Sequence, residues 1–152
     1  MVGGCYKQER LETDRGVYTI MQNVRCIEMK RVFISFAKED IRLRDLLRGQ
    51  ARNENSPFEY VDMSVKQPWD SQWKTNCRTR IKGCDGLIAI ITQNTRNADG
   101  QLWEIKCAQQ EGIPVLGIYG YNTHAGSIPS DCGYVRIVDW TWSNISGWLR
   151  TL

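Results

Sequence analysis

The sequence lacks several features that mark special classes of protein. Its longest unbroken apolar run is the five-residue segment Leu87–Ile91. A membrane-spanning helix needs about 20 such residues, so no span is expected. Proline is scarce, with 4 residues in 152, and glycine numbers 13, which argues against a collagen-like or disordered chain. The net charge of +3 is too small and too scattered to indicate a nucleic-acid binder.

Cysteine is present, but not in a metal-binding pattern. The six cysteines form no C-x-x-C pair, and His124 is the single histidine. We therefore expect no metal site, zinc included. An even number of cysteines is compatible with disulfides, but residues 1–7 lack the apolar core of a signal peptide. We expect reduced thiols and a cytoplasmic protein.

The length and the residue pattern predict one domain preceded by an extension. Residues 1–29 are polar with weak periodicity, and we interpret them as an N-terminal extension, with a functional arm as the alternative. Residues 30–152 read as a single domain. Short apolar segments predict strands at 31–36, 58–61, 85–92, 113–119 and 134–138. Amphipathic segments predict helices at 39–52, 71–82, 100–111 and from Trp142 to Leu149.

Strands that alternate with helices predict an α/β fold, with helices on both faces of a parallel sheet. Five strands at this length suit a flavodoxin-like three-layer sandwich with strand order 2-1-3-4-5. In such folds ligands bind beyond the carboxyl ends of the strands, at the switch point between the first and third strands. The expected walls are Ser35–Lys38, Thr92–Thr95 and the long connection after the second strand.

Familiar functions of this fold do not match that crevice. A phosphate-accepting receiver needs an aspartate at the end of the third strand, and Ile91–Asn94 contains none. The phosphate loop of a flavodoxin would be rich in glycine, which Phe36–Asp40 lacks. There is also no P-loop and no G-x-G-x-x-G motif. His124 has no nucleophile nearby in the sequence, and we interpret it as a surface residue.

One carboxylate stands out at the expected crevice. Glu104 lies in the first turns of the third helix, and its neighbours three and four residues away carry no positive charge. A helical salt bridge is therefore excluded. Either the helix dipole alone favours this carboxylate, or it is a functional acid that faces the crevice. Glu39, Asp40 and Asp45 lie among basic residues, and we expect them to form a solvated face.

Aromatic residues flank the same region. Trp69 and Trp73 bracket the junction before the second helix, and Trp103 directly precedes Glu104. Trp73 is expected to pack its helix on the sheet. Trp69 lies in a polar loop, where a partner contact or ring stacking suits it better.

These segments together resemble TIR domains. The first strand with its loop and the third strand resemble those of the family. Three further segments are similar to a bacterial TIR-like branch, which resembles the TIR protein of Thoeris antiphage defence. The first strand with its loop is residues 31–40, and the third strand is residues 85–92. The three further segments are residues 68–74, 103–105 and 113–117. Trp103 and Glu104 are adjacent here, whereas the usual TIR spacing places several residues between the tryptophan and the glutamate.

The resemblance implies an enzymatic activity. Catalytic TIR domains cleave the nicotinamide–ribose bond of NAD, and some close the product into a cyclic ADP-ribose isomer. NAD is then the substrate, and no separate cofactor is needed. Carried onto this sequence, the catalytic residue is Glu104. The expected substrate-binding residues at the crevice are Ser35, Phe36, Ala37, Lys38, Trp69, Asn94 and Trp103.

The resemblance also implies partners. In relatives the loop after the second strand mediates assembly, which predicts a homo-oligomer formed through Asp62–Asp70. A separate nucleotide-sensing effector protein would read the product, and neither nucleic acid nor a membrane is an expected partner. A non-enzymatic TIR signalling module is the main alternative. A small nucleotide-binding protein without chemistry is a third interpretation.

Overall fold

A computed structural model describes residues 6–13, 16–23, 29–54, 56, 58–62, 71–121 and 124–152. In chain order the elements are β1 (Tyr6–Thr13), β2 (Gly16–Asn23), β3 (Lys30–Ser35), η1 (Lys38–Asp40), α1 (Ile41–Asn53), β4 (Phe58–Val61), α2 (Ser71–Lys82), β5 (Gly86–Ile91), η2 (Thr95–Asn97), α3 (Asp99–Gln110), β6 (Val115–Tyr119), η3 (Ser130–Cys132), β7 (Arg136–Val138) and α4 (Trp142–Leu149).

Five of the strands form one parallel sheet in the order β4-β3-β5-β6-β7. Counted within the domain, this is the order 2-1-3-4-5, so the predicted flavodoxin-like α/β fold is confirmed. Every residue of β5 is buried. A central strand covered on both faces needs such a continuous apolar run. Leu87 lies opposite Phe33 of β3 on one side and Val115 of β6 on the other.

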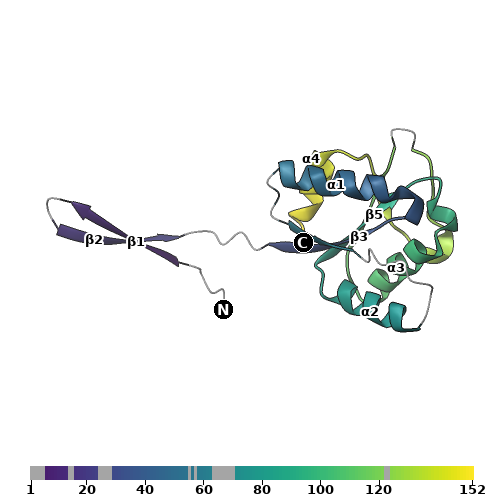
Figure 1. Cartoon of the computed structure of the whole chain (residues 1–152), viewed down its shortest axis with the longest axis horizontal. Coiled ribbons are helices and arrows are strands. Elements are labelled where there is room, and N and C mark those ends of the chain that lie inside the picture. Colours follow the sequence, from purple (N-terminus) through teal and green to yellow (C-terminus); the bar gives the residue numbers. More distant parts are fainter. Residues whose placement is uncertain are drawn as a thin grey trace.

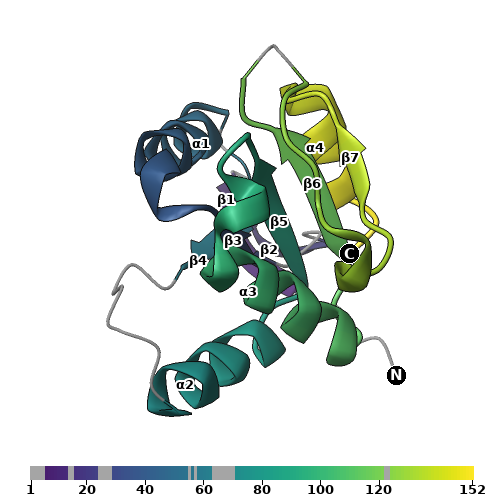
Figure 2. The same ribbon diagram turned by 90° about the vertical axis from the view of Figure 1, so that its right-hand side faces the viewer.

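Helices cover both faces of the sheet (Figure 1). Alternate residues along β3 face opposite layers. Ile34 packs in a cluster with Leu47 of α1 and Ile145 of α4, whereas Phe33 packs in a second cluster with residues of α2 and α3. Figure 2 shows α2 and α3 side by side beneath the sheet, with α1 and α4 on the opposite side.

The sequence pattern predicts one apolar face of Leu43, Leu46 and Leu47 for α1, and the structure corrects this prediction at Leu46. Leu43 and Leu47 are 8% and 1% exposed, but Leu46 is 60% exposed. Leu43, Leu47 and Ala51 recur at intervals of four residues, and this stripe faces the sheet. Leu46 lies one residue off that stripe and is therefore turned outward.

The N-terminal extension contains two strands that the sequence pattern did not predict. β1 and β2 pair antiparallel, from Tyr6 opposite Asn23 to Thr13 opposite Gly16. They form a sheet of their own, which lies outside the five-stranded sheet (Figure 1). Val17–Met21 contains the β-branched and aromatic residues that favour strands, and this was the available signal.

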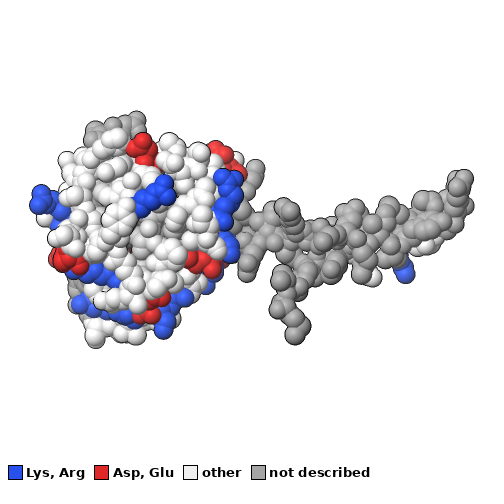
Figure 3. All heavy atoms as spheres, turned by 180° about the vertical axis from the view of Figure 1, so that it is seen from behind, with Lys and Arg blue, Asp and Glu red and all other residues white. Residues whose placement is uncertain are grey.

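The described surface is mixed in charge. On the face shown in Figure 3, basic and acidic side chains are interspersed. No helix within the described part of the chain is both long and apolar enough to cross a membrane.

Candidate functional site

The carboxyl ends of β3 and β5 meet at the switch point of the strand order. Ser35 is the last residue of β3 and lies opposite Ala89 of β5. Thr92 follows β5 directly, and α3 begins a few residues later and packs back against both strands. Side chains from β3, from the loop after β5 and from α3 therefore share this edge of the sheet.

Glu104 lies at this edge and is almost fully buried. It belongs to the second turn of α3, and the residue is 8% exposed. The hydroxyl of Ser35 donates a hydrogen bond to Oε2 of Glu104 at 2.5 Å. On the other side, Sγ of Cys77 in α2 lies 4.0 Å from Oε1. The carboxylate is thus held between β3, α2 and α3.

The Cys77 thiol is a neutral neighbour of this carboxylate. Cys77 is fully buried. Its burial, together with the nearby Glu104 charge, raises the pKa of the Cys77 thiol well above its usual range. At neutral pH it is therefore a protonated, weak hydrogen-bond donor that faces Glu104.

Gln101 is a site residue that the sequence reasoning missed. It lies one helical turn before Glu104 and is 2% exposed. Its Nε2 donates to the backbone oxygen of Ile90 at 2.7 Å and to that of Ser35 at 3.3 Å. The spacing of three residues places Gln101 and Glu104 on the same helix face, and this was the signal that could have found it.

Asn94 lies in a second polar network at the same edge. Its Nδ2 donates to Oδ1 of Asp40 at 3.0 Å, and the Thr92 hydroxyl donates to Oδ2 at 2.6 Å. Asp40 is 2% exposed, so the expectation that it belongs to a solvated face is wrong. The tight turn η1, closed by a hydrogen bond from the Asp40 amide to the Ala37 oxygen, directs this side chain beneath the loop after β5.

The remaining predicted residues of the first loop differ in their surroundings. Phe36 is buried in the cluster beneath α1, where the Arg44 guanidinium lies 5.3 Å from its ring. Ala37 is 1% exposed, and Lys38 is exposed at the start of η1. Of these three residues, only Lys38 presents its side chain to solvent.

Trp103 packs between the two helices of its layer. Its ring lies 5.4 Å from that of Trp73, with the planes tilted by 59°. The Arg78 guanidinium lies 5.8 Å from the Trp103 ring. Trp73 thus packs α2 against α3, close to its expected role. Trp69 lies outside the described residues, as does most of the Asp62–Asp70 loop.

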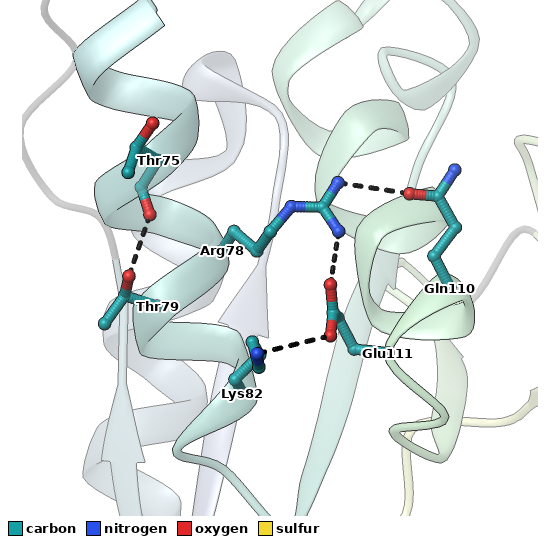
Figure 4. Close-up of polar contacts among 6 residues, drawn as sticks. All are labelled: Thr75, Arg78, Thr79, Lys82, Gln110 and Glu111. Atoms are coloured by element: carbon teal, nitrogen blue, oxygen red, sulfur yellow. Dashed lines mark hydrogen bonds and ion pairs between the residues drawn. The ribbon is translucent and has the colours of Figure 1, made fainter.

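Polar contacts fix the far ends of α2 and α3 to each other (Figure 4). Arg78 donates to the Glu111 carboxylate and, at 3.2 Å, to Oε1 of Gln110. The Lys82 ammonium lies 3.8 Å from Glu111. The left-handed Gly112, with φ of 70°, follows the end of α3, where a glycine commonly ends a helix. These contacts join the carboxyl-terminal end of α2 to the end of α3.

The thiols of this layer are free, and no metal cluster is found where the chain is described. Four cysteines, namely Cys77, Cys84, Cys107 and Cys132, are buried and unbridged. The described ranges contain no group of three or more His, Cys, Asp or Glu side chains that could hold a metal ion. His124 is exposed, with its Nε2 2.5 Å from Asp139.

The sheet order and the buried acid of α3 define a flavodoxin-like α/β domain with a carboxylate at its switch point. Residues 33–125 match the family model described as the TIR-like domain of Thoeris protein ThsB. Because the match covers more than half of the chain, the protein belongs to this TIR-like family. The TIR resemblance is thereby confirmed, and the membership supports a TIR-type role in antiphage defence.

The other comparisons add little. Among solved structures, the chain is similar to a 3-dehydroquinate dehydratase-like protein from Bifidobacterium longum. The identity is 7%, the alignment covers 81% of this chain and 94% of that chain, and the TM-score is 0.41. Such a distant likeness carries no argument. A search of curated proteins gave no match.

Proposed function

We propose that this TIR-like domain cleaves the nicotinamide–ribose bond of NAD, with Glu104 as the catalytic residue. The observation that supports this most strongly is the burial of Glu104 at the carboxyl edge of β3, with the Ser35 hydroxyl 2.5 Å from its carboxylate. Family membership supplies the class of chemistry. NAD is the substrate in this proposal, and no further cofactor takes part.

The proposed reaction needs one carboxylate. The bond between the anomeric carbon and the pyridinium nitrogen breaks, and its electron pair leaves with nicotinamide as a neutral ring. Positive charge then develops at the anomeric carbon, where a fixed carboxylate stabilises it. Water, or a nucleophilic group of the substrate's own adenosine half, forms the new bond to that carbon, and one proton is then released from the attacking half to solvent. Ordinary glycoside hydrolysis uses two carboxylates, because its leaving group must be protonated.

Ser35 orients the carboxylate in this proposal. Its hydroxyl is fully buried and donates to one oxygen of Glu104. A hydrogen bond to a charged acceptor is short and strong, and it fixes the rotamer of the acid. The Cys77 thiol contacts the other carboxylate oxygen of Glu104 and excludes water from that side. The acid is then pre-oriented before the substrate enters.

Substrate contacts are also proposed for the remaining predicted residues. Lys38 is exposed and offers a positive charge for the diphosphate of NAD. Asn94, whose amide is held by Asp40, is proposed to contact the substrate through its remaining polar atoms. Trp103 and Trp69 are proposed to stack on a base or to exclude water. Phe36 and Ala37 are proposed to contribute backbone groups.

We also propose that a cyclic ADP-ribose exceeds the linear product. Cyclisation is favoured when the adenosine half folds over the ribose and water is excluded, because intramolecular attack gains from proximity. A cyclic product is lighter than linear ADP-ribose by one water, so mass spectrometry distinguishes the two. A separate nucleotide-sensing effector protein would then bind it. If only the linear product forms, the protein is a plain NAD hydrolase.

Self-association through the Asp62–Asp70 loop is proposed to complete the site. Asp62 gives the loop a fixed root, because its carboxylate pairs with Arg44 and its backbone oxygen accepts a hydrogen bond from Arg80 at 3.0 Å. Trp69→Ala should weaken assembly and turnover together, since exposed aromatic residues are frequent interface anchors. A strictly monomeric protein with full activity at every concentration would contradict this.

Nicotinamide release from NAD tests the proposed function. The wild type should be assayed alone and again with a phage-infection trigger, because an unassembled TIR domain can be silent, and Glu104→Gln should lower the release by orders of magnitude. Glu111→Gln is the matched control, because it removes a carboxylate at the other end of the same helix. Near-normal release by a folded Glu104→Gln variant would contradict the assignment. No release by triggered wild-type protein would favour a non-enzymatic signalling module.

A further inference from the structure

Gln101 is a buried amide whose two ends have unequal surroundings. The residue is 2% exposed and lies in α3, one turn before Glu104. Its Nε2 bridges two backbone oxygens at the ends of neighbouring strands, that of Ile90 at 2.7 Å and that of Ser35 at 3.3 Å. Reversing the amide would place an oxygen against two carbonyl oxygens, so these contacts determine its orientation.

The oxygen of the same amide has no donor. Oε1 of Gln101 is buried, and no hydrogen-bond partner lies within reach among the described residues. A buried, unpaired amide oxygen destabilises a fold, and an apolar side chain of similar length would avoid that cost. Core packing therefore does not account for glutamine at this position. The two hydrogen bonds that Nε2 donates are the interactions that an apolar side chain would lack.

The nitrogen end connects to Glu104 through Ser35. Nε2 holds the carbonyl of Ser35, and the hydroxyl of Ser35 donates to Oε2 of Glu104 at 2.5 Å. That hydroxyl also lies 3.5 Å from the backbone oxygen of Gln101. The three residues are between 0% and 8% exposed, so water competes little for these bonds. A shift of the Ser35 backbone is therefore passed directly to the carboxylate.

We infer that Gln101 is a positioning residue that acts through Ser35 to fix the carboxylate of Glu104. This inference rests on the proposed function for its kinetic consequences, but not for its geometric ones. Loss of the amide releases the Ser35 carbonyl at the end of β3 from this contact, and the acid then samples rotamers that miss the anomeric carbon. A misplaced catalytic group lowers the rate of the chemical step more than it weakens substrate binding.

A double-mutant cycle tests the inference in the full-length protein. Gln101→Met removes the donor at nearly constant size, and Ser35→Ala removes the hydroxyl. Each variant should lower kcat for nicotinamide release by about 10-fold or more, with KM changed by less than about 3-fold. The double variant should be no slower than Ser35→Ala by more than about 3-fold, because both changes break the same connection.

Gln109→Met is the matched control. Gln109 belongs to the same helix, and its Nε2 donates to the backbone oxygen of Tyr134 at 3.3 Å, away from Glu104. The kcat of the Gln109→Met variant should equal that of the wild type. Circular dichroism and thermal melting of every variant establish that the fold is retained. Independent, multiplying losses in the double variant would overturn the inference, and so would a rise in KM at constant kcat.

A second measurement keeps the inference separate from the proposed function. Crystal structures of the wild type and of Gln101→Met should differ at one contact, with Ser35 Oγ and Glu104 Oε2 hydrogen-bonded only in the wild type. An unchanged contact in Gln101→Met would overturn the positioning role, whether or not the protein turns over NAD. If Gln101→Met loses the contact and the triggered wild type also releases no nicotinamide, the positioning role is supported and the proposed reaction is refuted.

Discussion

Two buried carboxylates lie at the carboxyl edge of the sheet, Asp40 just before α1 and Glu104 within α3. Asp40 is 2% exposed, and each of its oxygens accepts a hydrogen bond from the loop after β5. Glu104 is 8% exposed, and its described partners are a serine hydroxyl and a thiol. Asp40 joins two loops, whereas Glu104 lies between β3, α2 and α3, which apolar packing already fixes.

The difference indicates where each acid acts. Removing Asp40 would leave Thr92 and Asn94 without a charged hydrogen-bond acceptor, so Asp40 stabilises the structure of this edge of the sheet. Ser35 and Cys77 belong to β3 and α2, which are held by the core cluster around Phe33. Removing the charge of Glu104 should therefore leave the fold intact and affect the chemistry.

The largest effect on stability is expected for Asp40→Ala. The change leaves the Thr92 hydroxyl and the Asn94 amide without their buried acceptor, which should lower the free energy of unfolding by about 2–3 kcal/mol. Urea unfolding followed by circular dichroism measures it. Glu39→Ala, at the exposed neighbouring position, is the control and should change the value by less than about 0.5 kcal/mol. An equal loss of unfolding free energy in the two variants would contradict a structural role for Asp40.

A smaller effect is expected from alkaline pH, where thiols of the α2–α3 layer titrate. Burial raises the pKa of Cys84 from its usual value near 9 to about 11, and burial also raises the pKa of Cys107. The folded state then retains protons that the unfolded state loses. Stability is full below pH 9 and falls as the pH rises toward 11.

For Cys84 alone the loss between pH 8 and pH 10 should be about 1 kcal/mol. Urea unfolding at the two pH values measures it, and Cys84→Ala should show a smaller loss over the same interval. An equal loss in that variant would show that other groups control the alkaline limb.

The smallest effect is expected for Glu111→Gln, at a third carboxylate that also belongs to the α3 region. Glu111 pairs with Arg78 and Lys82, whose side chains are 40% and 61% exposed. Solvent-exposed ion pairs contribute little, so the melting temperature should fall by less than about 3 °C. Nicotinamide release should be unchanged. A large loss of release would mean that the alignment of α2 on α3 controls the site, which would sharpen the comparison with Glu104.

The sequence predicts the sheet well because its signals there are local. The continuous apolar run of β5 permits few environments other than a covered central strand. Alternation of strands and helices then restricts the topology. Glu104 was singled out because its neighbours three and four residues away carry no positive charge.

The rest depends on contacts between residues far apart in the chain. Asp40 sits among basic neighbours in the sequence, and only the turn η1 brings it beneath Thr92, 52 residues later. Gln101 bonds to Ser35 across 66 residues. A polar side chain carries no mark in the sequence that distinguishes such burial from exposure. The β1–β2 hairpin was missed because β1 is mostly polar, although Val17–Met21 in β2 carries residues that favour strands.

The central claim is that Glu104 stabilises charge in the transition state, and neither binds NAD tightly nor holds the fold together. The most direct test combines NAD binding by calorimetry with single-turnover nicotinamide release, for the wild type and Glu104→Gln. Binding should agree within about 3-fold, while release by the variant should be slower by on the order of 10²–10³-fold. Release within about 10-fold of the wild type by a folded variant that binds NAD equally well would contradict the account.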